Sequence, residues 1–324
     1  MITEEVKEPY LPISPHLIFP ERLGNFEVYV RRGSNYVLFT KERERFDERI
    51  KTKLYDLGVE EVFIKGSQKK AFDQYVRVNL GQILENESIP MEDRAEILHD
   101  VSTHMISEFF TNKLPEKVKQ RFFKDIMRMV TDCVNFFNNE EALAKLGQLI
   151  AHNYDVFTHN VDVFVLTMAV LNTFDLDHKT ITNAGIGALL HDVGKLSIHK
   201  KILDKNGLTT DPVEIKLLQQ HTVYGTALCA NLPLDGLSMS CILLHHEHED
   251  GSGYPSGISG DHIPFSIKVL SACNTYLQLT TPTPSKNALT PYKALQFMSK
   301  SMEGAFDPVV LKHLVMVLSG ANIL

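Results

Sequence analysis

The stretch Leu189-Leu190-His191-Asp192-Val193-Gly194-Lys195 places a histidine beside an aspartate at the end of an apolar segment. Ala184 and Ile186, together with the two leucines, predict a helix that ends at Gly194. A helix end lets both polar side chains turn inward while the backbone leaves. Four further histidines are predicted to approach this pair from other helices: His159, His221, His245 and His246. Imidazoles and a carboxylate that converge in this way are what a two-metal hydrolytic centre needs.

Each histidine taken alone has a plainer interpretation. His159 lies in a strongly apolar helical segment, where a histidine is more often a hydrogen-bonded core residue, and His221 fits an ordinary helix face. Side chains of neighbours such as His245 and His246 point about 100° apart on a helix, so they bind one ion only near a helix end, or else one binds and one orients. Asp192 is the natural bridging ligand, because an ionised carboxylate can offer one oxygen to each of two metals.

Two further features surround these histidines. Gly251-Ser252-Gly253-Tyr254-Pro255-Ser256-Gly257 predicts a tight exposed loop directly after the double histidine. Tyr254 can swing over a cleft from this loop, although the loop can also be a mere connector. Lys195 follows the histidine–aspartate pair and is a candidate contact for a substrate phosphate.

The composition limits the class of protein. The 324 residues are 44% hydrophobic and 23% charged, as in a soluble globular protein, and the net charge of −7 argues against a DNA-binding protein. The first residues form no apolar signal core, and no stretch reaches the roughly 20 apolar residues of a membrane span. The four cysteines lie in apolar helical patterns, which predicts small core residues in a reducing compartment. We therefore expect a cytoplasmic protein that does not associate with membranes.

The pattern of elements predicts a mostly α protein in three segments. Residues 1–88 form a small α+β domain with a strand at Phe26–Val30, a hairpin partner at Tyr36–Phe39 and a third strand at Val62–Ile64. A helix with Phe46, Ile50 and Leu54 on one face is expected between the second and third of these strands. Residues 89–139 form a helical connector, and residues 140–324 form an all-helical domain. Three helix starts are marked by a capping residue followed by proline: Asp211-Pro212, Thr290-Pro291 and Asp307-Pro308.

These motifs together resemble the HD-GYP family, a subgroup of the HD metal-dependent phosphohydrolases. The resemblance runs from about His159 to Leu324 and rests on motifs in a fixed order. They are His191 to Lys195, the loop Lys205 to Thr209 before His221, His245-His246-Glu247 with Asp250 to Pro255, Gly260 to Pro264, and Phe306-Asp307-Pro308. The resemblance implies an all-helical HD-type domain with a di-iron or dimanganese centre. It also implies hydrolysis of the bacterial messenger cyclic di-GMP to linear pGpG and often on to GMP.

The resemblance also implies roles for individual residues. His159, His191 and Asp192 would hold one metal, and Asp192 would bridge to a second metal held by His221, His245 and His246. Lys195 would contact the substrate phosphate. Tyr254 belongs to the signature loop, which the family places at the active-site rim and in contacts with GGDEF-domain proteins. Asp155 stands where some members carry an acidic ligand for a third metal, but this side chain is shorter, so we expect two metals at most.

The chain departs from the family pattern at Asn274, where members usually carry an aspartate ligand, and at Gln278, where they carry a further acid. An amide oxygen can coordinate a hard cation but brings no negative charge. A weaker first metal site is therefore expected, and a mononuclear or substrate-assembled centre stays open. The alternative to catalysis is a degenerate module that binds cyclic di-GMP or a GGDEF partner without efficient turnover. A phosphohydrolase acting on a mononucleotide or an alarmone is a third interpretation, against which Gly253-Tyr254-Pro255 argues. Regulatory phosphodiesterases are often dimers, so a homodimer is an open alternative to a monomer.

Overall fold

The computed structural model describes residues 8–18, 24–44, 49, 52, 54, 59, 61–111, 116–137, 141–142, 145, 156–203, 205, 211–282, 287–321 and 323. The chain divides into two compact units, Met1–Arg94 and Ala95–Leu324. The predicted α+β region at the N-terminus and the all-helical region after it are both confirmed. The division into segments 1–88, 89–139 and 140–324 stays a prediction, as does the helix expected to carry Phe46 and Ile50, which falls largely outside the described residues.

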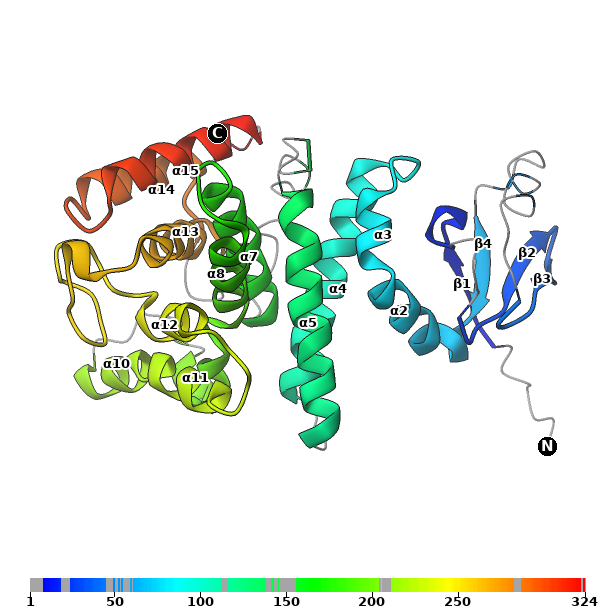
Figure 1. Cartoon of the computed structure of the whole chain (residues 1–324), viewed down its shortest axis with the longest axis horizontal. Coiled ribbons are helices and arrows are strands. Elements are labelled where there is room, and N and C mark those ends of the chain that lie inside the picture. The colour runs from blue at the N-terminus through cyan, green and yellow to red at the C-terminus, as the bar shows by residue number, and fades with distance from the viewer. Residues whose placement is uncertain are drawn as a thin grey trace. The chain divides into compact units, whose positions relative to one another are not determined.

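The first unit contains an antiparallel sheet of four strands in the order β1-β4-β2-β3 (Figure 1). The strands are β1 Tyr10–Ile13, β2 Val28–Arg32, β3 Asn35–Thr40 and β4 Val62–Lys65. The predicted hairpin β2–β3 is present, and its turn holds Gly33 at a φ of 61°, a left-handed conformation that favours glycine. The sequence did not predict β1, because Pro12 argues against a strand. A proline is tolerated there because β1 is an edge strand.

Helices of the first unit pack through aromatic residues. They are η1 Pro15–Leu17, η2 Gly66–Gln68, α2 Lys69–Val78 and α3 Leu80–Glu85. Phe26, which enters β2, lies 5.3 Å from the rings of both Phe72 and Tyr75 on α2, edge to face in each case. Val28 and Ile64 on the sheet are buried as well. The unit therefore has its own small hydrophobic core.

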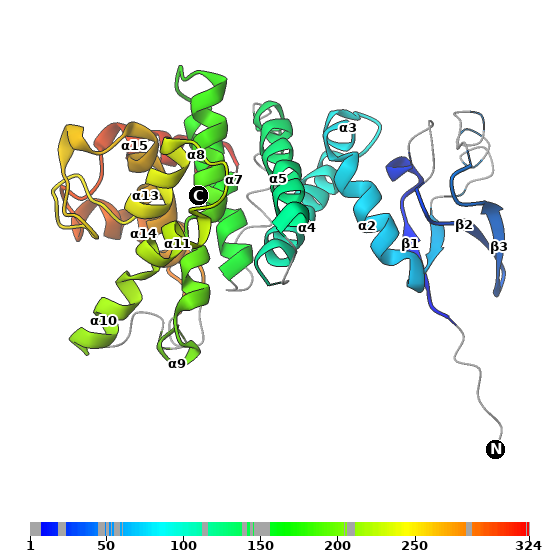
Figure 2. The same cartoon turned by 60° about the horizontal axis from the view of Figure 1, so that its bottom comes forward.

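The second unit is built from helices. They are α4 Met91–Thr111, whose residues up to Arg94 belong to the first unit, α5 Glu116–Phe136, α7 Val156–Leu171, α8 His178–Leu190, η3 Val193–Ser197, α9 Lys200–Leu203, α10 Pro212–Gln219, α11 His221–Cys229, α12 Gly236–Leu244, η4 Gly260–His262, α13 Phe265–Thr280, α14 Pro291–Lys300 and α15 Pro308–Gly320. The pair α7 and α8 forms the centre, with α12 against α8 and α13 against α7. Figure 2 shows α13 beside the α7–α8 pair. Nearly every residue of α7 is buried, which explains why its sequence is apolar on all sides.

The predicted caps are confirmed at all three helix starts. Asp211, Thr290 and Asp307 each accept a main-chain hydrogen bond from the first turn of the helix that follows, with proline in that first turn. The helix expected to run through His221 is divided at Gln220, so His221 opens α11 instead of lying within a longer helix.

All four cysteines are buried and free, as predicted for small core residues. Among the described residues, no helix combines the length and the apolar character that a membrane span requires.

A buried ion pair joins α4 to α7 within the second unit. Nε2 of His99 lies 3.0 Å from Oδ1 of Asp162. Burial opposes protonation of His99, but hydrogen bonds to Asp100 and Asp162 outweigh it and raise the pKa of His99 from 6.5 to about 9. The protonated imidazole therefore contributes its full stabilisation below about pH 6.5, and this contribution is lost as the pH rises through about 9.

We expect the free energy of unfolding to fall by about 3 kcal/mol more in the unmodified chain than in His99→Asn between about pH 6 and pH 10. Denaturant unfolding at both pH values measures this difference. His104→Asn is the matched control, because His104 is an exposed histidine of the same helix. A similar pH dependence in His99→Asn and the unmodified chain would contradict the ion pair.

Candidate metal centre

Helix ends bring the predicted histidines together. His159 lies within α7, whereas His191 and Asp192 directly follow α8. His221 opens α11, and the double histidine directly follows α12. The packing of α8 against α7 and α12 brings these ends into one buried region. Each side chain at a helix end can point inward because the backbone no longer has to continue the helix.

A close backbone contact positions His221 relative to Asp192. Gly194 in η3 packs so tightly on α11 that a Cβ at this position would overlap the main chain at His221 and Gly225. Only glycine permits this approach of η3 to α11. The contact leaves Nε2 of His221 at 3.1 Å from Oδ1 of Asp192.

The carboxylate of Asp192 lies at the middle of the cluster. Its side chain is fully buried, and its two oxygens lie between 3.1 and 3.6 Å from Nε2 atoms of four histidines: His159, His191, His221 and His245. Two groups have ligand atoms within 4.8 Å of one another: Asp192 with His221, His245 and His246, and Asp192 with His159 and His191. The structure thus brings together all six of the predicted histidine and aspartate ligands.

Hydrogen bonds to main-chain carbonyls fix the orientation of three of the imidazoles. Nδ1 of His191 lies 2.7 Å from the oxygen of Ala188, and Nδ1 atoms of His221 and His245 make the same type of contact one turn back along the chain. A carbonyl only accepts, so each Nδ1 carries the proton and each neutral ring presents a lone pair at Nε2. Carbonyl contacts of this kind commonly orient metal-binding histidines.

Several lone pairs that face the centre of the buried cluster have no hydrogen-bond donor among the described residues. Nε2 of His221 lies 3.1 Å from Nε2 of His245, so two lone pairs face each other. Nε2 of His191 and Oδ1 of Asp192 are buried and receive no hydrogen bond of suitable geometry from the described residues. A cation between the two nitrogens would offset this arrangement, because two lone pairs at this distance repel. Neighbouring ligands of one metal ion, each about 2.1 Å from it, are themselves roughly 3 Å apart. The donor set therefore fits a divalent metal.

The electrostatics keep the ligands in their metal-binding protonation states. Burial lowers the pKa of His159 to about 4 and holds the pKa of His191, His245 and His246 below the ordinary value. Burial opposes ionisation of Asp192, but Lys195 and the facing imidazoles hold the pKa of its carboxyl well below its usual range. At neutral pH these imidazoles are neutral and the carboxylate is charged, as metal binding needs.

Asn274 lies on the His159 side of the cluster. Its Oδ1 is 3.0 Å from Nε2 of His159 and accepts a hydrogen bond of 3.1 Å from Nε2 of Gln278. The side chain of Asn274 is fully buried in α13. The position expected for a metal ligand is therefore beside the cluster, and the amide of Gln278 stabilises its oxygen.

The two predicted substrate contacts also border the cluster. Lys195 is 7% exposed and forms an ion pair with Oδ2 of Asp192. The ring of Tyr254 stacks on His246, with centroids 4.5 Å apart and planes 19° apart. Tyr254 thus covers one face of the cluster from the predicted loop. Asp155, the candidate third-metal ligand, lies outside the described residues.

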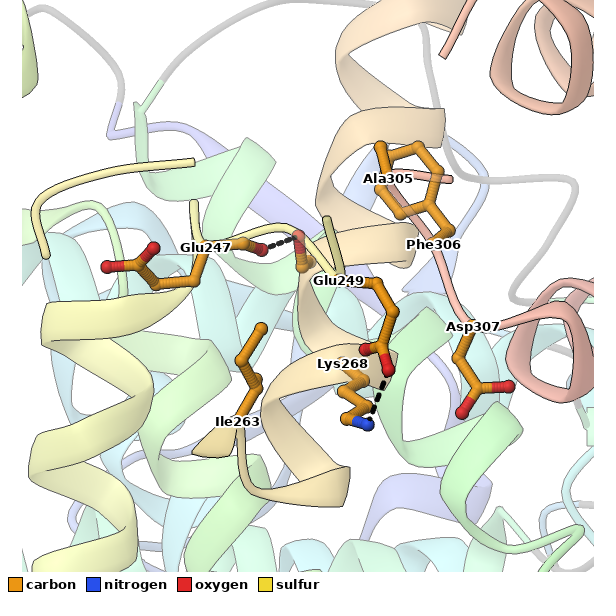
Figure 3. Close-up of a pocket in the computed structure, with 8 residues that line it drawn as sticks. Glu247, Glu249, Ile263, Lys268, Ala305, Phe306 and Asp307 are labelled. Atoms are coloured by element: carbon orange, nitrogen blue, oxygen red, sulfur yellow. Dashed lines mark hydrogen bonds and ion pairs between the residues drawn. The ribbon is translucent and has the colours of Figure 1, made fainter. Parts of the chain in front are cut away.

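The loop that carries Tyr254 is fixed to its surroundings at several points. Figure 3 shows Glu249 facing Lys268 of α13, with the ammonium 2.9 Å from the carboxylate. The hydroxyl of Ser271 donates to the main-chain oxygen of Glu247 over 3.0 Å. These contacts anchor the start of the loop on α13.

No role was predicted for Glu247. Its side chain is only 1% exposed, and its Oε1 accepts the main-chain N–H groups of Ser256 and Gly257 at 2.7 and 3.1 Å. The carboxylate therefore connects the start of the loop to its end and holds Tyr254 over His246. A glutamate directly after the double histidine was a visible signal, but its partners ten residues away were not.

We expect Glu247→Ala to lower the free energy of unfolding by about 3 kcal/mol, because two main-chain donors lose a buried, charged acceptor. The same change should expose the loop to limited proteolysis between Asp250 and Gly257. Asp250→Asn is the matched control, since Asp250 is an exposed acid of the same loop. A Glu247→Ala protein as stable and as protease-resistant as the unmodified chain would mean that Glu247 does not hold the loop.

The comparisons with known proteins agree with this site. Residues 139–310, more than half of the chain, match the model of the HD domain family. The chain belongs to the HD domain family, and the resemblance to its HD-GYP subgroup is confirmed. A solved HDG"Y"P protein from Bdellovibrio bacteriovorus shares the fold, with a TM-score of 0.67 and 19% identity over 96% of this chain and all of that one.

Curated relatives match over part of their length. A cyclic di-GMP phosphodiesterase of Pseudomonas aeruginosa is 27% identical over 65% of this chain and 50% of its own length. A cyclic di-GMP phosphodiesterase of Thermotoga maritima is 26% identical over 61% of this chain and 52% of its own. A 3'3'-cGAMP-specific phosphodiesterase of Vibrio cholerae is 34% identical, over 37% of this chain and 26% of its own. The chain thus spans about half the length of the first two.

Proposed function

We propose that this protein is a metal-dependent phosphodiesterase that hydrolyses cyclic di-GMP to pGpG, to GMP, or to both. The observation that carries the proposal is the distance of 3.1 Å between Nε2 of His221 and Nε2 of His245. Their lone pairs face each other beside the buried carboxylate of Asp192. The names of the relatives support a cyclic dinucleotide as the substrate. They also favour turnover over the alternative of a module that only binds the messenger.

We assign the residues as follows. His159, His191, Asp192 and Asn274 hold one divalent cation, and Asp192, His221, His245 and His246 hold the other. Mixed imidazole and carboxylate ligation suits iron or manganese. The bound cations would supply Lewis acidity toward the phosphoryl group and activate the attacking water.

The remaining polar groups act on the substrate. Lys195 is a buried ammonium beside Asp192, so it adds fixed positive charge where the phosphoryl oxygens gain negative charge in the transition state. Tyr254 presents an aromatic ring at the rim, where it orients the nucleotide. Its burial raises the pKa of the phenol, so the ring acts as a neutral group throughout the physiological range.

We also propose a domain organisation, a compartment and partners for the whole protein. Residues 1–88 form a regulatory domain, residues 89–139 a connector and residues 140–324 the catalytic domain, in a cytoplasmic protein. GGDEF-domain proteins are the proposed protein partners, and a homodimer stays open beside a monomer.

Anaerobic purification with metal analysis, followed by a turnover assay with iron or manganese, tests the proposal. We expect cyclic di-GMP to be consumed and pGpG or GMP to appear only in metal-loaded samples. 3'3'-cGAMP is the competing substrate, and faster turnover of it would reassign the specificity. Tight binding of cyclic di-GMP without product would favour the binding module, and no bound metal would refute the proposed centre.

A further inference from the structure

The two oxygens of Asp192 divide the cluster into two sides. Oδ1 lies 3.1 Å from His221 and 3.6 Å from His245, measured to Nε2. Oδ2 lies 3.5 Å from His191 and 3.6 Å from His159, again to Nε2. We call these the Oδ1 side and the Oδ2 side. One carboxylate charge serves both.

The Oδ2 side already holds a cation of the protein itself. The ammonium of Lys195 contacts Oδ2 from three residues along the chain, and the side chains of both partners are almost fully buried. Oδ1, in contrast, faces the imidazoles of His221 and His245, which are neutral when a metal binds. A metal ion on the Oδ2 side therefore competes with Lys195 for the same oxygen, and a metal ion on the Oδ1 side does not.

Asn274, the remaining residue of the Oδ2 side, does not offset the competition from Lys195. Oδ1 of Asn274 lies 3.0 Å from His159 but carries no charge, and it already accepts a hydrogen bond from Gln278. The Oδ1 side has a third imidazole, that of His246, within reach of the same ion. The two sides thus differ in the number of imidazoles, three on the Oδ1 side against two on the Oδ2 side, and in the presence of a competing ammonium.

We propose that divalent cations fill the two sides in sequence, and that Lys195 controls the second step. The Oδ1 side binds first and more tightly. The Oδ2 side fills when a phosphodiester attracts the ammonium of Lys195 away from Asp192 and frees Oδ2 for the metal. Substrate phosphate and the second cation then bind cooperatively, and each raises the affinity for the other by the same factor. This inference rests on the proposed metal centre and extends it to the order of assembly.

Titration of the full-length protein with Mn²⁺, with free Mn²⁺ followed by electron paramagnetic resonance, tests the order without any turnover. We expect one tight and one weak site, with affinities about tenfold or more apart. Dimethyl phosphate, a phosphodiester without bases, should tighten the weak site, and sodium chloride at equal ionic strength should not. Two sites of equal affinity, or no effect of dimethyl phosphate, would overturn the inference.

Two variants separate the contributions. Lys195→Met should tighten the weak site about tenfold and abolish the effect of dimethyl phosphate, because the competing charge is gone. Asn274→Asp should also tighten it but leave the effect of dimethyl phosphate intact. Lys200→Met is the control, since Lys200 is an exposed lysine five residues further on, and it should change neither site.

The outcomes distinguish this inference from the proposed function. A Lys195→Met protein with an unchanged weak site would overturn the competition, while two bound cations would still support the metal centre. If Lys195→Met does not fold, Asn274→Asp and the dimethyl phosphate titration of the unmodified chain still decide between sequential and equal filling. No bound Mn²⁺ at all would remove both the inference and the metal centre.

Discussion

Replacing Asp192 with asparagine is expected to remove both metal ions and to reduce turnover at least about 10³-fold. Among the residues that the structure describes, Asp192 is the one carboxylate that belongs to both groups of imidazoles. Metal ions supply several kcal/mol of transition-state stabilisation, and each 1.36 kcal/mol corresponds to a tenfold change in rate. Asparagine preserves the size of the side chain, so the change is mainly one of charge. Metal analysis and cyclic di-GMP turnover on the same sample measure both effects.

Asp162→Asn is the matched control for this substitution. Asp162 is almost as buried as Asp192, but it forms an ion pair with His99 on α4. The control protein should lose stability yet keep both metals. An Asp192→Asn protein that retains two metals and normal turnover would mean that Asp192 does not bridge them.

Replacing Gly194 with alanine is expected to lower the free energy of unfolding by about 3 kcal/mol or more, because the added Cβ has no space. The overlap is with the main chain at His221 and Gly225, which cannot rotate away as a side chain can. Protein that still folds must move α11 away from η3. His221 then moves away from Asp192, and the metal on that side is lost. Thermal unfolding and Mn²⁺ binding measure the two consequences.

Gly236→Ala provides the control for a methyl group added at a glycine. Gly236 opens α12 after the cap Asp235, and a Cβ there meets no atom within 4 Å. We expect its stability to change by less than about 1 kcal/mol, with both metals retained. A Gly194→Ala protein as stable as Gly236→Ala would contradict the close contact between η3 and α11.

The clustering of these histidines with Asp192 was predictable because its signals are local. His191 and Asp192 precede a helix-breaking glycine, and His245 and His246 end an apolar helix, so their positions could be inferred from the sequence. The caps at Asp211, Thr290 and Asp307 were predictable for the same reason.

Long-range contacts explain what the sequence did not reveal. The strand β1 is recognised through its pairing with β4, which lies some fifty residues away, and not through its own composition. Glu247 stabilises the loop through main-chain N–H groups, which every residue except proline provides. The proposed competition between Lys195 and a metal ion arises because the buried ammonium contacts the carboxylate oxygen that the metal would use. No periodicity or motif records such distances.

Anomalous X-ray diffraction from crystals of the manganese-loaded protein, with dimethyl phosphate present, tests the proposed metal centre around Asp192 most directly. We expect two anomalous peaks, one beside each oxygen of Asp192. His221, His245 and His246 should surround one peak, and His159 and His191 the other. Crystals with manganese bound elsewhere and no peak beside Asp192 would contradict the assignment of these buried residues as a metal centre.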